Sequence, residues 1–172
     1  MRTDLAALTA DLVAIDSVNP ALVPGGAGET EIARFVAGWA RAAGLEASTL
    51  EATPGRPSVL VRAAGSGGGR TLLLCAHLDT VGTEGMADAH RPRVDGDRLY
   101  GRGAYDMKAG LAAALAACRE LAGTGLAGDV VVAAGARCCC ARTSTPSATT
   151  GWPTRSSRGS TATGCTAAAP TT

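Results

Sequence analysis

Residues 71–79 read Thr-Leu-Leu-Leu-Cys-Ala-His-Leu-Asp, an almost wholly apolar run that ends in a histidine and an aspartate. Such a run is typical of a strand covered on both faces in an α/β sheet. Because His77 and Asp79 are two residues apart, an extended backbone places both side chains on one face. They lie at the carboxyl end of the strand, where open α/β sheets place their ligand sites. A histidine that is hydrogen-bonded for structural reasons is the alternative.

Helices and strands alternate on both sides of this run. Apolar residues at helical spacing predict the helices, with Thr3 or Asp4 as the first cap and Gly44 as the end of the second. The expected helices cover residues 5–15, 32–43 and 107–121, and the further strands cover 45–50, 58–61 and 129–133, with a hairpin over 93–99. This order predicts an α/β fold with helices packed on a mixed, mostly parallel sheet.

The composition narrows the class of protein. The 172 residues are 46% hydrophobic and only 3% aromatic, with a net charge of +1, so neither nucleic acid nor a membrane is an expected partner. No run approaches the roughly 20 apolar residues that span a bilayer, and no secretory signal precedes the first helix. Cys75 and Cys118 lie in apolar surroundings, as reduced core cysteines do, which predicts a cytoplasmic protein.

A second polar group follows the hairpin, where Gly101-Arg102-Gly103 precedes Asp106 and an apolar helix. The Asp106 carboxylate could cap that helix, or it could reach back over the sheet to a metal held by His77. Glycines allow the backbone to pass close to such a site. A nucleotide-binding module is a third interpretation, but this turn matches neither a P-loop nor Gly-x-Gly-x-x-Gly.

The stretches Ala76-His77-Leu78-Asp79-Thr80-Val81 and Leu99-Tyr100-Gly101-Arg102-Gly103-Ala104-Tyr105-Asp106-Met107-Lys108-Ala109-Gly110 resemble the two signatures of the M20 metallopeptidase family, which includes acetylornithine deacetylase and succinyl-diaminopimelate desuccinylase. Ala109 stands where a glycine is more usual. The resemblance implies the N-terminal part of a zinc-peptidase-like catalytic domain. It also implies two divalent metal ions, Zn²⁺ first, with Co²⁺ and Mn²⁺ as alternatives.

The resemblance also implies residue roles and a reaction. His77 would bind one metal ion, Asp106 would bridge two, and Asp79 would be the catalytic residue that orients His77. The implied reaction is hydrolysis of the amide bond of an N-acyl amino acid or a peptide by a metal-activated water. His90, the other histidine, is interpreted as an ordinary loop residue.

The family pattern breaks after the last predicted strand. The family carries a Glu-Glu pair there, which provides the general base and a further ligand. This sequence has residues 135–141, Gly-Ala-Arg-Cys-Cys-Cys-Ala, and no acidic residue after Asp129. We therefore expect weak or no hydrolase activity. The alternative is a non-catalytic fragment that associates with another subunit, or forms a homo-oligomer, through an exposed sheet edge.

Residues 1–136 are thus expected to form a partial metallohydrolase catalytic domain, and residues 137–172 a low-complexity, disordered tail. From Arg137 onward there are four arginines and no Leu, Ile, Val, Phe, Tyr or Met, which is too little apolar surface for a core. This abrupt change favours a reading-frame shift near Gly135. The adjacent Cys138, Cys139 and Cys140 do not match Cys-x-x-Cys metal spacing.

Overall fold

The computed structural model describes residues 3–135. Asp4 caps the first helix, because its carboxylate accepts the backbone N–H groups of Ala6 and Ala7 at 3.0 and 3.1 Å. The elements, in chain order, are α1 (Leu5–Ala14), α2 (Thr30–Ala42), β1 (Glu46–Leu50), β2 (Ser58–Ala63), β3 (Leu72–His77), β4 (Arg93–Asp95), β5 (Arg98–Tyr100), the kinked turn η1 (Ala104–Lys108), α3 (Ala109–Leu121) and β6 (Val130–Gly135).

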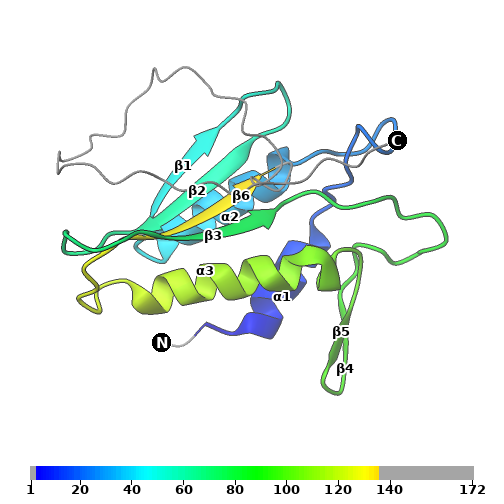
Figure 1. Ribbon diagram of the computed structural model, residues 1–172. Helices are drawn as coiled ribbons and strands as arrows, with labels where there is room; N and C mark the ends of the chain where they lie inside the picture. The colour runs from blue at the N-terminus through cyan, green and yellow to red at the C-terminus, as the bar shows by residue number, and fades with distance from the viewer. Residues whose placement is uncertain (1–2, 136–172) are drawn as a thin grey trace, which may run out of the picture. The chain divides into compact units, whose positions relative to one another are not determined.

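Four strands form one mixed sheet in the order β1-β2-β6-β3 (Figure 1). The β1–β2 and β2–β6 pairs are antiparallel, whereas β3 runs parallel to β6, with His77 opposite Gly135. The expected α/β class with a mixed sheet is therefore confirmed. Among residues 3–135, the parallel character is confined to the β3–β6 pair.

All three helices contribute to one hydrophobic core against one face of the sheet. Alternate residues of β2 and β6, such as Val59, Val61 and Val132, are fully buried there. Helix α2 packs on β1 and β2, while α3 packs on β2, β6 and β3. Leu12 of α1 and Leu115 of α3 complete the core from below. Several of the apolar helix residues that recur at helical spacing, such as Leu8, Leu12, Ile32 and Val36, are buried, whereas Leu5 of the same pattern is 48% exposed.

The expectation that the residue 71–79 run is covered on both faces is wrong for the described chain. Strand β3 lies at the edge of the sheet, and Leu72 and Leu73 are 50% and 55% exposed. Leu73 lies on the sheet face that no helix of residues 3–135 covers, whereas Leu72, on the other face, is exposed at the start of this edge strand. An apolar run reports the hydrophobicity of a strand, but not its position in a sheet.

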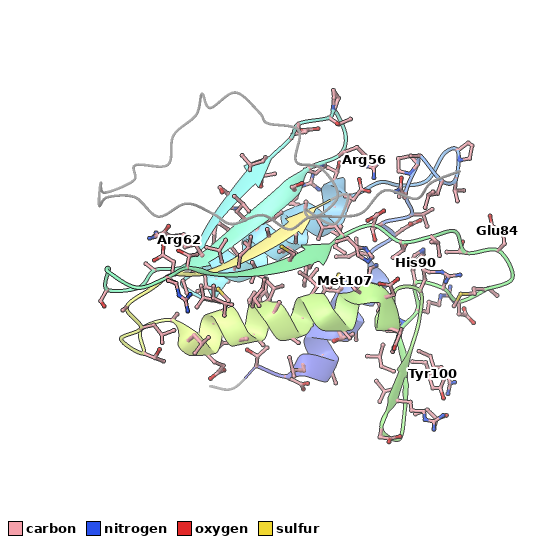
Figure 2. All side chains as sticks on the ribbon, in the orientation of Figure 1. Arg56, Arg62, Glu84, His90, Tyr100 and Met107 are labelled. Carbon is pink, nitrogen blue, oxygen red and sulfur yellow. The ribbon has the colours of Figure 1, made fainter. Side chains whose placement is uncertain are left out.

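The hairpin of β4 and β5 projects away from the sheet (Figure 1). Its Tyr100 ring packs beneath the Arg93 guanidinium, at 4.5 Å from the ring centroid (Figure 2). Cys118 is a buried free thiol. No helix in the described range combines the length and apolarity that a membrane span requires. The predicted tail at 137–172, with its three adjacent cysteines, lies outside the described residues.

Candidate metal site

His77 is the last residue of β3, at the end of the parallel β3–β6 pair. The strand pairing is continued by Leu78, whose N–H donates to the Gly135 carbonyl at 2.8 Å. The backbone N–H of His77 itself faces the Met107 sulfur at 3.2 Å. The histidine is therefore held from two sides, by the sheet and by the turn that precedes α3.

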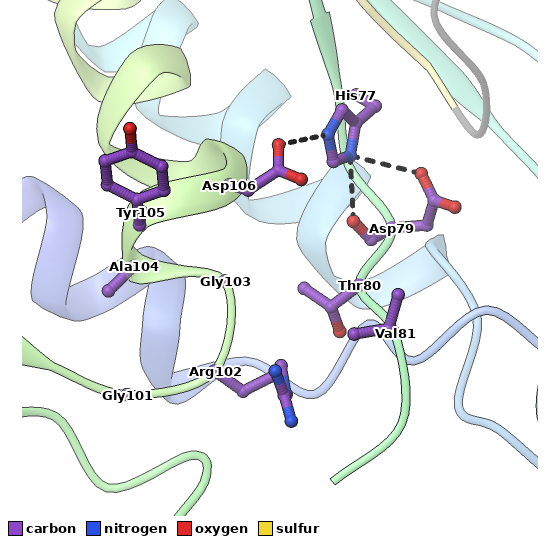
Figure 3. Close-up of a pocket in the computed structure, with 10 residues that line it drawn as sticks. All are labelled: His77, Asp79, Thr80, Val81, Gly101, Arg102, Gly103, Ala104, Tyr105 and Asp106. Carbon is purple, nitrogen blue, oxygen red and sulfur yellow. Dashed lines mark hydrogen bonds and ion pairs between the residues drawn. The ribbon is translucent and has the colours of Figure 1, made fainter.

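A chain of hydrogen bonds orients the His77 ring (Figure 3). Its Nδ1 lies 2.9 Å from the Asp79 carbonyl oxygen and 3.3 Å from the Asp79 carboxylate. Both of these atoms are acceptors, so Nδ1 carries a proton and donates. The other oxygen of Asp79 accepts the Asn19 amide at 2.7 Å. Asn19 is only 6% exposed, so Asp79 is fixed by a side chain that is itself buried.

Asp106 approaches the opposite nitrogen of the ring. Its Oδ1 lies 3.0 Å from His77 Nε2, although the two residues are 29 positions apart. The backbone at Asp106 is not helical, with φ −123° and ψ 101°, and helix α3 begins after Lys108 without a side-chain cap. The capping interpretation of Asp106 is therefore wrong, and its carboxylate does reach back to the end of β3.

These contacts shift the pKa values of His77 and Asp79, which are both partly buried. The Asp79 hydrogen bond, supported by that of Asp106, raises the pKa of His77 to about 9 against the opposing effect of burial. Burial alone would raise the pKa of Asp79, but the hydrogen bonds from His77 and Asn19 outweigh it and lower that pKa. The arrangement thus favours an ionised Asp79 beside a ring whose Nδ1 is a donor.

A cavity of about 320 Å³ opens at this point between the end of β3 and the glycine-rich turn (Figure 3). It is lined by His77, Asp79, Thr80, Val81 and residues 101–106. Gly103, with φ +78°, lets the turn lie against Thr80, since a Cβ at Gly103 would sit 2.7 Å from the Thr80 methyl carbon.

Lys108 anchors the same turn from the side of α1. Its side chain is 1% exposed, and its ammonium group donates to the Ile15 carbonyl at 2.7 Å. Burial lowers the pKa of Lys108 to about 8. The turn that presents Asp106 is therefore tied to the end of the first helix.

The chemical types of the donor atoms, an imidazole nitrogen and carboxylate oxygens, are those that bind divalent metal ions. An imidazole Nε2 and a carboxylate oxygen converge, and a second carboxylate orients the ring from the other nitrogen. The number of donors does not fit, because residues 3–135 contain no group of three or more His, Cys, Asp or Glu side chains placed to hold a metal ion. Zinc sites use three or four protein ligands. His90 does not line the cavity, and its Nε2 lies 3.5 Å from Asp16 (Figure 2).

Some residues around the cavity had no role in the sequence interpretation. Asn19 was placed in a loop, yet it holds Asp79, and Met107 was placed in a helix, yet its sulfur faces the His77 amide. Thr80 and Arg102 line the cavity although the sequence singled out neither for binding. No spacing rule identifies Asn19, because its contact with Asp79 spans 60 positions.

Comparison with known proteins finds similar sequences and similar structures. Residues 73–136 match the model of peptidase family M20/M25/M40. Succinyl-diaminopimelate desuccinylase from Dinoroseobacter shibae is 35% identical over 136 residues, which cover 76% of this chain and 34% of that protein. The chain thus spans about one third of the length of this curated relative.

Solved structures share the fold. An M20 family metallo-carboxypeptidase from Sulfolobus solfataricus superposes with a TM-score of 0.63 at 23% identity, covering 77% of this chain and 30% of that one. A dinuclear metal-binding M20 peptidase from Bacillus subtilis gives 0.51 at 17% identity, covering 75% and 33%. Over residues 73–136 the chain is similar to peptidase family M20/M25/M40, and the solved structures share its fold.

Proposed function

We propose that this chain carries part of the site of a metal-dependent amide hydrolase, in which His77 and Asp106 hold divalent metal and Asp79 orients His77. The observation that supports this most is the convergence of His77 Nε2 and Asp106 Oδ1 at 3.0 Å, with Asp79 on the other ring nitrogen. Because residues 3–135 offer fewer than the three or four ligands that a zinc ion needs, the two metal ions that we propose, Zn²⁺ first, would require further ligands from outside these residues. Bound in that way, they would supply the Lewis acid and the metal-activated water of amide hydrolysis.

The substrate class proposed is N-acyl amino acids or peptides. The curated relative is a desuccinylase by name, and two of the similar solved structures are a metallo-carboxypeptidase and a peptidase. Both names imply the hydrolysis of an amide bond. The buried free thiol of Cys118 supports a reducing compartment, and we propose the cytoplasm.

The roles of the chain's own residues follow from their contacts. Asp79 accepts a hydrogen bond from His77 Nδ1 and thereby keeps Nε2 directed toward Asp106. Asn19 in turn prevents the Asp79 carboxylate from rotating away. No glutamate is among the described residues that line the cavity, so this part of the chain offers no general base of the kind the family uses. We therefore propose weak or absent turnover.

Cobalt titration tests the metal proposal directly. The wild-type chain is expected to develop the visible absorption of protein-bound Co²⁺, and both His77→Asn and Asp106→Asn are expected to lose it. Asp97→Asn is the matched control, because its carboxylate is 99% exposed on the hairpin. Equal binding by all four proteins would contradict the proposal.

A second candidate function is association without catalysis, either with another subunit or with a second copy of the chain. It is favoured by the position of β3, whose outer edge pairs with no strand of residues 3–135 and whose Leu72 and Leu73 are half-exposed. Edges and apolar patches of this kind favour pairing with other chains.

A further inference from the structure

Two polar groups in the cavity wall have no partner among the described residues. The Nε of Arg102 and the hydroxyl of Thr80 are both shielded from solvent, and neither makes a hydrogen bond within residues 3–135. No carboxylate of that range forms an ion pair with the Arg102 guanidinium. A buried donor left unpaired costs about 1–3 kcal/mol, so two in one wall call for an explanation.

The backbone fixes both groups in place. Arg102 donates its N–H to the Ala89 carbonyl at 2.7 Å. Thr80 donates its N–H to Ser17 and accepts the N–H of Asn19, each at 2.9 Å. The two side chains are therefore presented by anchored segments, and a ligand that binds them needs little ordering of the protein.

Charge identifies the kind of ligand. Of the residues that line the cavity, Arg102 alone carries a permanent positive charge. Its planar guanidinium matches the geometry of a carboxylate, and a threonine hydroxyl can donate a further bond to the same anion. Figure 3 shows the Arg102 side chain on the Thr80–Val81 side of the cavity, apart from the His77–Asp106 contact.

We propose that Arg102 and Thr80 form a carboxylate-binding subsite. It would bind the carboxylate of an N-acyl amino acid or peptide whose amide bond lies at His77 and Asp106. This identification of the ligand as the substrate rests on the proposed function. The cavity of about 320 Å³ contains both groups of residues, and it is within the size range of small-molecule sites. Arg102 thus becomes a specificity residue that selects acidic over neutral amides.

Anion binding can be measured without metal, which separates this proposal from that of the metal site. The ¹⁵N-labelled full chain in EDTA is titrated with N-acetylglycine and with its neutral analogue N-acetylglycinamide, and NMR follows the Arg102 Nε–H and Thr80 amide signals. The carboxylate probe is expected to shift both signals saturably and to bind at least about tenfold more tightly than the amide, as a charge-assisted bond requires. Equal binding of the two probes would overturn the proposal.

Three variants locate the anion. Arg102→Gln is expected to abolish the preference for the carboxylate, whereas Arg98→Gln, which removes a guanidinium that is 76% exposed on the hairpin, is expected to retain it. Thr80→Val is expected to weaken binding several-fold while its melting temperature stays equal or rises, because an unpaired hydroxyl is replaced by a methyl group. A purely structural Thr80 would lose stability instead.

His77→Asn tests the alternative that the anion binds at His77, because the imidazole is the other group lining the cavity that can carry a positive charge. If this variant loses the carboxylate preference and Arg102→Gln keeps it, the anion lies at His77 and the subsite is wrong. If cobalt binding fails while the carboxylate preference holds, only the metal proposal is wrong.

Discussion

At the scale of single residues, the hydrogen-bond chain from Asn19 through Asp79 to His77 is the most specific feature of the molecule. Each of these hydrogen bonds joins side chains that are mostly buried, and the series leaves His77 Nε2 facing Asp106. Partners that orient a metal-binding histidine commonly change metal affinity when they are altered.

Asp79→Asn tests this orientation. The substitution keeps the size of the side chain but removes its charge beside Nδ1. We expect the affinity for Zn²⁺ or Co²⁺ to fall by about 10–100-fold, measured by competition with a chromophoric chelator. Asp97→Asn is expected to bind as the wild type does, and an unchanged affinity in Asp79→Asn would remove its orienting role.

A buried ion pair tests a second residue-scale feature. The Glu29 side chain is fully buried and accepts two bonds from Arg56, whose side chain is 14% exposed (Figure 2). Arg56→Gln leaves the Glu29 carboxylate buried without its charged partner, and we expect a loss of about 3–5 kcal/mol in the free energy of unfolding. Urea denaturation measures it.

Arg34→Gln is the matched control for that experiment. Arg34 pairs with Glu31 on the same helix, but both side chains are about two-thirds exposed, at 67% and 66%. We expect a change below about 1 kcal/mol. Similar losses in the two variants would show that burial is not what makes the Glu29–Arg56 pair matter.

At the scale of elements, the glycine-rich turn before α3 determines where Asp106 points. Gly103→Ala adds a Cβ at φ +78°, 2.7 Å from the Thr80 methyl carbon and 3.2 Å from Lys108 Cδ. Gly125→Ala meets the same backbone strain, at φ +80°, but nothing lies within 4 Å. We expect the free energy of unfolding to fall by about 1–2 kcal/mol for Gly125→Ala and by about 2–4 kcal/mol for Gly103→Ala.

The same pair of variants should separate in function. Only Gly103→Ala displaces the cavity wall, so only this variant is expected to lose Co²⁺ binding, measured by visible absorption at a temperature where both variants are folded. Equal metal binding in the two variants would mean that the turn tolerates a shift at Gly103.

The junction of β2 and β6 predicts a pH dependence. Asp129 accepts the Arg62 guanidinium and the Gly65 N–H, each at 2.8 Å, and the bond from Arg62, more than any other effect, lowers the pKa of Asp129 below its usual 3.8. The stability that this carboxylate adds is therefore present above its unfolded pKa and is lost as the pH falls through the folded value.

Asp129→Asn should reveal that dependence. We expect the variant to be about 1 kcal/mol less stable than the wild type at pH 5–8, with the difference shrinking as the pH falls below 3.8 and the carboxylate becomes protonated in the folded state. Denaturation curves from pH 8 to pH 2.5 measure it. A constant difference across that range would mean that the amide, rather than the charge, explains the loss.

Local patterns predicted most of these elements because each is determined by its own residues. Asp4 and Gly44 mark helix ends through capping and a positive φ, and both lie where the sequence indicates. The contact of Asn19 with Asp79 and the edge position of β3 were not predictable, since both depend on which distant segments meet. For Asp106 the sequence predicted two alternatives, helix capping or an approach to His77, and only the non-helical backbone at Asp106 excludes capping.

At the scale of the whole molecule, the open side of the sheet predicts self-association. Leu73→Lys places a charge on that face at a residue that is 55% exposed, whereas Leu22→Lys does so in a loop at 61% exposure. We expect the wild type and Leu22→Lys to associate with rising concentration, and Leu73→Lys to do so markedly less. Light scattering coupled to size-exclusion chromatography measures the mass, and a monomeric wild type at every concentration would contradict this.

The edge position of β3 also determines where another strand could add residues to the proposed metal site. A strand added in parallel to the outer edge of β3 would end beside His77, because parallel neighbours share their carboxyl ends. Side chains at that end would then lie beside the proposed metal site without any change in the β3–β6 register. The outer edge of β3 is thus also a place from which a second chain could supply further ligands to the proposed metal site.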